Sequence, residues 1–229
     1  MSVERNIDEV KKNIERAKQR SRYDQEVELI AVTKTVDDER MMQAYRSGIL
    51  DFGENKVQEI QKKYESFPKE VRWHLIGTLQ TNKVKYIIDK VHMIHSLDRD
   101  SLAKEIDKRA GERSKVMDCL VQVNISQEDS KHGQTKEETL DFVAHVCNSY
   151  PHIRIRGLMG MAPFEEDNER TRRYFADMKK LFEEAKTLNL GKSEMKYLSV
   201  GMTNDYEIAI EEGSTIVRVG TGIFGERNY

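Results

Sequence analysis

Glu28-Leu-Ile-Ala-Val-Thr-Lys-Thr35 is the stretch that decides the fold. Its residues from Leu29 to Thr33 are apolar or β-branched, which is typical of a short strand buried on both faces. A helical pattern begins at Asp37, so Lys34 lies where a strand ends and a loop begins. An amine held there against apolar neighbours would have its charged form disfavoured and would be available as a nucleophile. The alternative is a solvated lysine at the start of a surface loop.

The pattern of strand followed by helix recurs along the rest of the chain. Seven further runs have strand character, namely Ile49–Phe52, Val71–Ile76, Val91–Ile94, Val116–Ile125, Ile153–Leu158, Tyr197–Val200 and Thr215–Val219. Parallel strands need helical crossovers, and eight such units close into a (β/α)8 TIM barrel of α/β class. A doubly wound open sheet is the alternative architecture. The strand count and the lack of a dinucleotide fingerprint after the first strand favour the barrel.

Helical periodicity accounts for most of the remaining residues. An extra amphipathic helix over residues 3–20 precedes the first strand, with Val3, Ile7, Val10, Ile14 and Ala17 on one side. The other helices are expected from Asp37 to Gly48, from Val57 toward Pro68, after Lys83 to Asp89, from Asp98 to Gly111, from Thr135 to Asn148, from Asn168 to Leu188 and from Asp205 to Glu212. No linker or low-complexity segment interrupts them. We therefore expect residues 1–229 to form one barrel domain, with the helix of residues 1–20 packed on it.

Composition excludes several classes of function. The chain has 38 Lys and Arg against 40 Asp and Glu, a net charge of −2, and interleaved charges, which argues against a nucleic-acid-binding surface. No apolar stretch approaches the length of a membrane span, and the first residues lack the apolar centre of a signal peptide. Cys119 and Cys147 have no metal or redox spacing and are interpreted as buried thiols in a reducing compartment. These features predict a cytoplasmic protein.

The loop after the last strand is the second candidate for binding chemistry. Gly220-Thr-Gly-Ile-Phe-Gly225 stands where barrel enzymes often bind phosphate on backbone amides, to which the Thr221 hydroxyl would add a hydrogen bond. Ser199, at the end of the seventh strand, would do the same. The eighth and first strands are neighbours in a closed barrel, so one ligand would touch both this loop and Lys34. Pyridoxal 5′-phosphate needs an amine for its aldehyde and donors for its phosphate. Alternatively, the glycines merely make a tight turn.

Arg218 comes just before that loop and is expected to reach the centre of the site. A guanidinium is always charged and only donates hydrogen bonds. Facing the pyridine nitrogen, it would discourage protonation of the ring and weaken the ring as an electron sink. An arginine paired with an acidic residue at the barrel rim is the alternative.

Six stretches in order along nearly the whole chain resemble the pyridoxal phosphate homeostasis proteins, also called the YggS/PROSC family. They are Ala-Val-Thr-Lys-Thr (31–35), Phe-Gly-Glu-Asn (52–55), Trp-His-Leu-Ile-Gly-Thr-Leu-Gln-Thr-Asn-Lys (73–83), Arg-Gly-Leu-Met-Gly-Met-Ala (156–162), Leu-Ser-Val-Gly-Met-Thr-Asn-Asp (198–205) and Arg-Val-Gly-Thr-Gly-Ile-Phe-Gly (218–225). Any one of them alone is weak, and together they are specific. Two small departures are Thr81, where the family often has serine, and Gly222, where alanine is common.

The resemblance implies a barrel like the N-terminal domain of alanine racemase. It also implies a role for each candidate residue: a Schiff base on Lys34, a contact near the ring substituents for Asn55, a contact to the pyridine nitrogen for Arg218, and phosphate contacts for Ser199, Gly220 and Thr221. Members of the family are thought to store or deliver pyridoxal 5′-phosphate. The resemblance further implies apoenzymes as recipients, and we expect a monomer.

Two hypotheses about turnover follow. A racemase needs acid/base groups on both faces of the substrate α-carbon, and the sequence leaves no room after Gly225 for the second domain that helps supply the opposing tyrosine in racemases. Tyr206 and Tyr229 are the conceivable substitutes. The first hypothesis is therefore a non-catalytic carrier. The second is a single-domain racemase or lyase acting on an unidentified amino acid, and a third reading is a barrel kept as an interaction scaffold.

Other candidate sites are weaker. His92 and His95 are predicted to point to opposite faces of one strand, so they are not expected to bind one metal. The acidic run from Glu165 to Asp167 is interpreted as a solvated helix start. The loop of residues 126–134 is predicted at the barrel rim, and the sequence assigns it no chemistry.

Overall fold

A computed structural model of the chain describes residues 2–124, 133–163, 167–191 and 193–226. The strands are β1 (Glu28–Val32), β2 (Asp51–Glu54), β3 (Arg72–Leu75), β4 (Met93–Leu97), β5 (Met117–Val123), β6 (Ile153–Gly160), β7 (Ser193–Met202) and β8 (Ile216–Val219). They pair in parallel in sequence order, and β8 pairs with β1, so the sheet is a closed barrel. The predicted TIM barrel is confirmed, and the open-sheet alternative is wrong.

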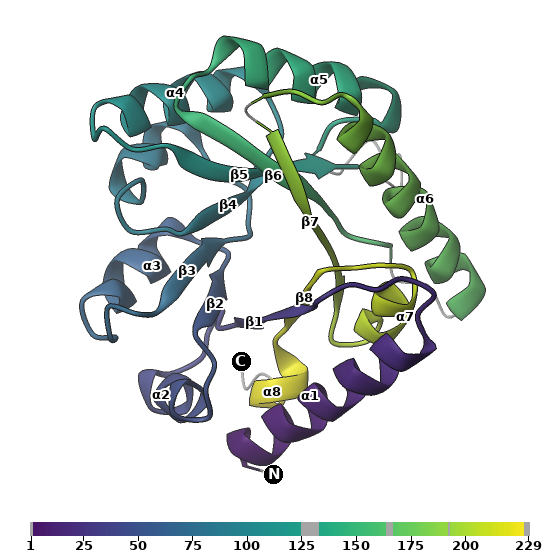
Figure 1. Cartoon of the computed structure of the whole chain (residues 1–229). Helices are drawn as coiled ribbons and strands as arrows, with labels where there is room; N and C mark the ends of the chain where they lie inside the picture. Colours follow the sequence, from purple (N-terminus) through teal and green to yellow (C-terminus); the bar gives the residue numbers. More distant parts are fainter. Residues whose placement is uncertain (1, 125–132, 164–166, 192, 227–229) are drawn as a thin grey trace.

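The helices surround the strands (Figure 1). They are α1 (Val3–Arg20), α2 (Asp38–Arg46), α3 (Val57–Tyr64), α4 (Asp100–Gly111), α5 (Lys136–Ser149), α6 (Asn168–Thr187), α7 (Tyr206–Glu211) and α8 (Thr221–Phe224). Asp37 caps α2, and Thr135 with Glu138 forms a capping box on α5, as the sequence predicts. None of the described helices is long and apolar enough to cross a bilayer.

Several elements differ from the sequence expectation, among them β2, which lies two residues later than predicted. The helix predicted after Lys83 is instead a short 3-10 helix, Thr81–Tyr86, whose β-branched residues and asparagine are weak α-helix formers. β4 begins and ends later than predicted, at Met93 and Leu97, and β7 continues to Met202. Both shifts change which side chains enter the barrel.

Apolar residues fill two separate layers. The larger cluster lies between the strands and the helices. The smaller one lies among the strands and consists of Ile30, Met93, Leu120, Met159, Tyr197 and Ile216. Interiors of such barrels are usually filled by bulky apolar side chains, as these six do here. Several polar residues of the strands are buried as well, among them His74, His95, Ser199 and Arg218.

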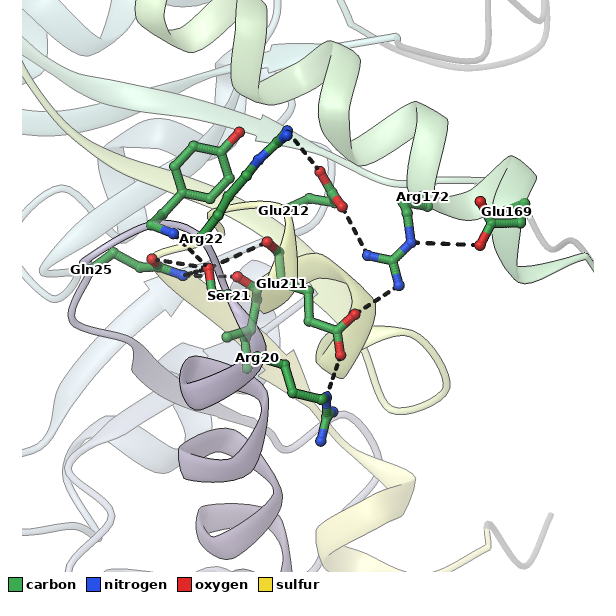
Figure 2. Close-up of polar contacts among 10 residues, drawn as sticks. Arg20, Ser21, Arg22, Gln25, Glu169, Arg172, Glu211 and Glu212 are labelled. Carbon is green, nitrogen blue, oxygen red and sulfur yellow. Dashed lines mark hydrogen bonds and ion pairs between the residues drawn. The ribbon is translucent and has the colours of Figure 1, made fainter.

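The N-terminal helix α1 lies against α7 and α8, as Figure 1 shows. It buries the five apolar residues predicted for its inner face. At its C-terminal end, charged side chains of three helices form what we call the outer ion-pair network, which consists of Arg20, Arg172, Glu207, Glu211 and Glu212. Figure 2 shows Arg172 between Glu211 and Glu212, with Arg20 on the other side of Glu211.

Candidate functional site

The loops at the carboxyl ends of the strands enclose a cavity of about 630 Å³. This volume lies in the range that holds small-molecule ligands and cofactors. Five of the six predicted site residues line it: Lys34, Asn55, Arg218, Gly220 and Thr221. Elements from opposite ends of the sequence therefore meet at this cavity because β8 pairs with β1.

Lys34 lies in the turn after β1, and its half-buried side chain forms part of the cavity wall. The Val36 amide donates to the Thr33 carbonyl at 3.0 Å and closes this turn. Between them, Thr35 has a φ of 65°, a strained conformation for a β-branched residue. Such strain persists only where the surrounding structure imposes it, and it is common at ligand sites.

A buried ion pair below the turn imposes that conformation. The Lys63 ammonium donates to Glu54 Oε1 at 2.7 Å and to the Thr33 carbonyl at 3.0 Å, and Thr33 Oγ1 donates to the same carboxylate oxygen at 2.6 Å. Burial raises the pKa of the Glu54 carboxyl, and Lys63 opposes that effect. All three side chains are buried. The residue immediately before Lys34 is therefore held by side chains of both β2 and α3.

Asn55 follows β2 and reaches the cavity because the neighbouring backbone comes unusually close to it. A Cβ atom added to Gly77 would lie 2.4 Å from the Asn55 carbonyl oxygen, so only glycine fits there. Gly77 lines the same cavity. The glycine after β3 thus allows the position of Asn55.

The loop after β8 brings backbone amides together. The amides of Gly220 and Gly222 both donate to Thr203 Oγ1 at 3.3 Å. A Cβ on Gly222 would lie 2.9 Å from Val219 Cγ1, which explains a glycine at this position. Thr203 and Thr221 line the cavity beside these amides. Two amides and two hydroxyls thus gather at one end of the cavity, which is the donor set that a phosphate group requires.

Arg218 lies at the base of the cavity and is almost fully buried. Its Nη1 donates to the Ser199 carbonyl at 2.7 Å and to Ser199 Oγ at 2.5 Å, and its Nη2 donates to the Gly160 carbonyl at 2.9 Å. Burial lowers the pKa of Arg218 to about 10, with Asp205 acting in the opposite direction. The guanidinium therefore remains charged at neutral pH. Burial raises the pKa of the Asp205 carboxyl, which also lines the cavity.

Ser199 is the predicted site residue that does not line the cavity. It is fully buried in β7, and its hydroxyl contacts Arg218. The reason is the length of β7, which continues to Met202 and leaves Ser199 three residues before its end. Thr203, the hydroxyl residue that reaches the cavity, was missed. Its signal was its position among Gly201-Met-Thr-Asn-Asp205, just beyond a strand end.

Tyr206, one of the two tyrosines considered as proton donors, does not line the cavity. The Tyr206 hydroxyl accepts from Asn13 Nδ2 of α1 at 3.2 Å, and burial raises the pKa of this tyrosine. Tyr229 lies outside the described residues, as does most of the loop of residues 126–134. Glu165 and Glu166 are outside them too, whereas Asp167 caps α6.

The histidine prediction is wrong in its geometry. The rings of His92 and His95 both contact the ring of His74, with centroids 5.5 and 5.1 Å away. They do not point to opposite faces because β4 begins only at Met93, so His92 lies outside the strand. Across the described residues, no group of three His, Cys, Asp or Glu side chains is placed to hold a metal ion.

Comparisons with known proteins agree with this geometry. The family model of the alanine racemase N-terminal domain matches residues 6–228. The pyridoxal phosphate homeostasis protein of Aquifex aeolicus (strain VF5) is 41% identical over 229 residues, which covers 99% of this chain and 97% of that protein. The structure of PipY from Synechococcus elongatus PCC7942 without PLP (pyridoxal 5′-phosphate) has a TM-score of 0.87 at 29% identity and covers 98% of this chain and 100% of that one. Its structure with PLP bound has a TM-score of 0.79 at 32% identity and covers 93% and 100%. The chain therefore belongs to the pyridoxal phosphate homeostasis protein family, with the barrel fold of the alanine racemase N-terminal domain.

Proposed function

We propose that this protein binds pyridoxal 5′-phosphate, holds it covalently on Lys34 and acts in its intracellular homeostasis, by storage and delivery, without catalytic turnover. The observation that carries the proposal is a single cavity that contains both the Lys34 amine and the amide-lined loop at Gly220. The names of its relatives and the PLP-bound PipY structure support it.

The groups around the cavity fit the cofactor at both of its ends. The Lys34 amine would condense with the aldehyde carbon and release one water molecule. The amides of Gly220 and Gly222, with the hydroxyls of Thr203 and Thr221, would donate to the phosphate. Asn55 lies on the same wall and would contact the ring substituents.

Arg218 explains why binding need not lead to turnover. When bound, pyridoxal 5′-phosphate supplies a reactive aldehyde and a ring that withdraws electrons. A protonated guanidinium opposite the ring nitrogen only donates, so it keeps that nitrogen unprotonated and makes the ring a weaker electron sink. No observation on the described residues favours the racemase or lyase alternative, since Tyr206 is engaged with α1. We expect no rapid exchange of amino-acid α-hydrogens in deuterated water.

The attachment is tested by the visible spectrum of the purified protein before and after borohydride reduction, with peptide mapping of the modified residue. Wild type should carry the label at Lys34, and Lys34→Ala should lose the absorbance while keeping the fold. Lys56→Ala is the matched control, because Lys56 lines the same cavity and offers a competing amine. Label on Lys56, or an unchanged spectrum of Lys34→Ala, would refute the assignment.

The cellular setting is part of the same proposal. Both cysteines are free and buried, which fits a reducing cytoplasm. We propose a monomer that transfers its ligand to apoenzymes. Sedimentation of the loaded protein tests the first point, and the regain of activity by a pyridoxal-phosphate-dependent apoenzyme tests the second.

A further inference from the structure

Five polar side chains form a continuous hydrogen-bonded chain through the barrel, from β2 to β8. His74 Nε2 lies 2.9 Å from Asp51 Oδ1, and His74 Nδ1 lies 2.9 Å from His95 Nε2. His95 Nδ1 then lies 3.3 Å from Ser199 Oγ, which accepts from Arg218. We call this set the interior chain. It begins at Asp51, at the start of β2, and ends at Arg218 at the cavity.

The two ends of the interior chain determine which atom donates in each of its hydrogen bonds. Arg218 can only donate, so the Ser199 oxygen accepts from it and the Ser199 hydroxyl proton points to His95 Nδ1. His95 then carries its proton on Nε2 and donates to His74 Nδ1. His74 in turn donates from Nε2 to the Asp51 carboxylate. One arrangement with two neutral imidazoles therefore satisfies each ring nitrogen.

The surroundings support this arrangement. His74 and His95 are almost completely buried. Burial lowers the pKa of His95 well below 6.5, and the positive charge of Arg218 acts in the same direction. At the far end, burial alone would raise the pKa of Asp51, but hydrogen bonds from His74 and Arg72 outweigh it and lower that pKa to about 2. The interior chain thus has a carboxylate at one end and a guanidinium at the other.

Three further ionisable groups of the described residues face the interior chain, at its two ends and beside His74. The guanidinium of Arg72 binds both oxygens of the Asp51 carboxylate. The ring of His92 packs against the ring of His74, and burial lowers the pKa of His92. Asp205 interacts electrostatically with Arg218 from the cavity side.

We propose that His95 and His74 are positioning residues, which orient the Ser199 hydroxyl and so hold the Arg218 guanidinium at the base of the cavity, facing the ring nitrogen of the ligand. The identity of that ligand rests on the proposed function. Buried polar groups are tolerated only when they are fully hydrogen-bonded, and a satisfied network favours one geometry. Six apolar side chains fill the neighbouring layer of the barrel, so polar residues are not needed merely to occupy this volume.

The first measurement needs no ligand. Nitrogen-15 spectra of histidine-labelled protein report the tautomer of each ring, with His74→Gln and His95→Gln used to assign the signals. At neutral pH both rings should be neutral and protonated on Nε2. A charged ring, or a proton on Nδ1 in either residue, would overturn the inferred direction. In the same samples, the guanidinium protons of Arg218 should exchange faster in Ser199→Ala than in wild type.

The second measurement uses protein loaded with pyridoxal 5′-phosphate that is nitrogen-15-labelled in the ring. In His95→Leu the ring-nitrogen signal should move toward the protonated form, and affinity should fall about tenfold, as expected from the loss of one hydrogen bond to a charged group. His95→Gln, whose amide both accepts and donates, should restore most of the affinity. Met93→Leu is the matched control, because Met93 is buried in the same barrel but outside the interior chain. If His95→Leu does not fold, Ser199→Ala replaces it.

The outcomes separate the two proposals. Unchanged affinity and ring-nitrogen signal in His95→Leu or Ser199→Ala would mean that the carbonyls of Ser199 and Gly160 suffice to hold Arg218, and would overturn the positioning role. A wild-type protein that never attaches the cofactor would refute the proposed function instead. The tautomers and the exchange of Arg218 would still decide the positioning role in that case.

Discussion

The interior chain and the outer ion-pair network are built from similar contacts in opposite environments. Arg20 Nε lies 2.6 Å from Glu211 Oε1, and Arg172 Nη1 lies 2.8 Å from Glu212 Oε1, while inside the barrel His74 Nδ1 lies 2.9 Å from His95 Nε2. The Arg20 side chain is 49% exposed and that of Arg172 is 33% exposed, whereas His95 is 0% exposed. Solvent screens the first set more than the second, because the histidines of the second are buried. Equal distances therefore do not mean equal energies.

The Glu54–Lys63 pair belongs with the buried contacts. Its side chains are 0% and 2% exposed, and it holds the strand end that carries Lys34. Removing one partner of such a pair leaves a buried charge without compensation, whereas exposed pairs tolerate the same change. The loss of stability on removing one partner is therefore expected to exceed that at the outer ion-pair network by the most at this pair.

The largest expected effect is that of Lys63→Met. It should lower the free energy of unfolding by about 3–5 kcal/mol, because the Glu54 carboxylate remains buried without the ammonium that compensates its charge. The double variant Glu54→Leu/Lys63→Met should recover most of this loss. Urea unfolding measures both, with Arg172→Met as the more exposed control. Equal losses of unfolding free energy in Lys63→Met and Arg172→Met would show that burial does not determine how much these ion pairs contribute.

The dependence of stability on acid pH reports on Asp51, at one end of the interior chain. The pKa of Asp51 falls from 3.8 to about 2 on folding. Between these values the unfolded chain binds the proton and the folded chain does not, so stability present above about pH 4 is lost as the pH falls through about 2. The loss should be about 2 kcal/mol larger in wild type than in Asp51→Asn. Urea unfolding over this pH range gives the pH dependence of the unfolding free energy for wild type and for Asp51→Asn. Parallel curves for the two proteins would show that Asp51 is not held as described.

The fold was largely predictable because it depends on local patterns. Eight apolar runs separated by helical periodicity are visible in the sequence, and the order of parallel strands in a closed barrel follows from them. Lys34 and the loop at Gly220 were placed correctly at the cavity for the same reason, since both directly follow strands adjacent in the barrel.

The predictions that differ from the structure depend on where strands end and on how they pair. Ser199 was expected to reach the cavity from the end of the seventh strand, but β7 continues past it to Met202, and Ser199 is buried in the barrel interior. The contact of His74 with His95 requires β3 to pair with β4 so that His74 lies beside Met93, which no local pattern reveals. The interior chain exists only once β7 and β8 close the barrel, so it could not be predicted residue by residue.

The smallest expected effect is at the outer ion-pair network, and it is the sharpest test of the role of water. Arg172 contacts both Glu211 and Glu212 across α6 and α7 (Figure 2). Because the Arg172 side chain is partly exposed, and Glu211 and Glu212 keep Arg20 and Arg22 as partners, Arg172→Gln should change the free energy of unfolding by only about 0.2–1 kcal/mol. At about 1 M salt, where charges are screened within about 3 Å, this difference should nearly disappear. The effect of Lys63→Met should persist under the same conditions, because ions do not reach that pair.

Urea unfolding of the variants with and without salt measures both differences. A salt-independent effect of Arg172→Gln would mean that the contribution of Arg172 comes from packing of its aliphatic stem against the helices rather than from its charge.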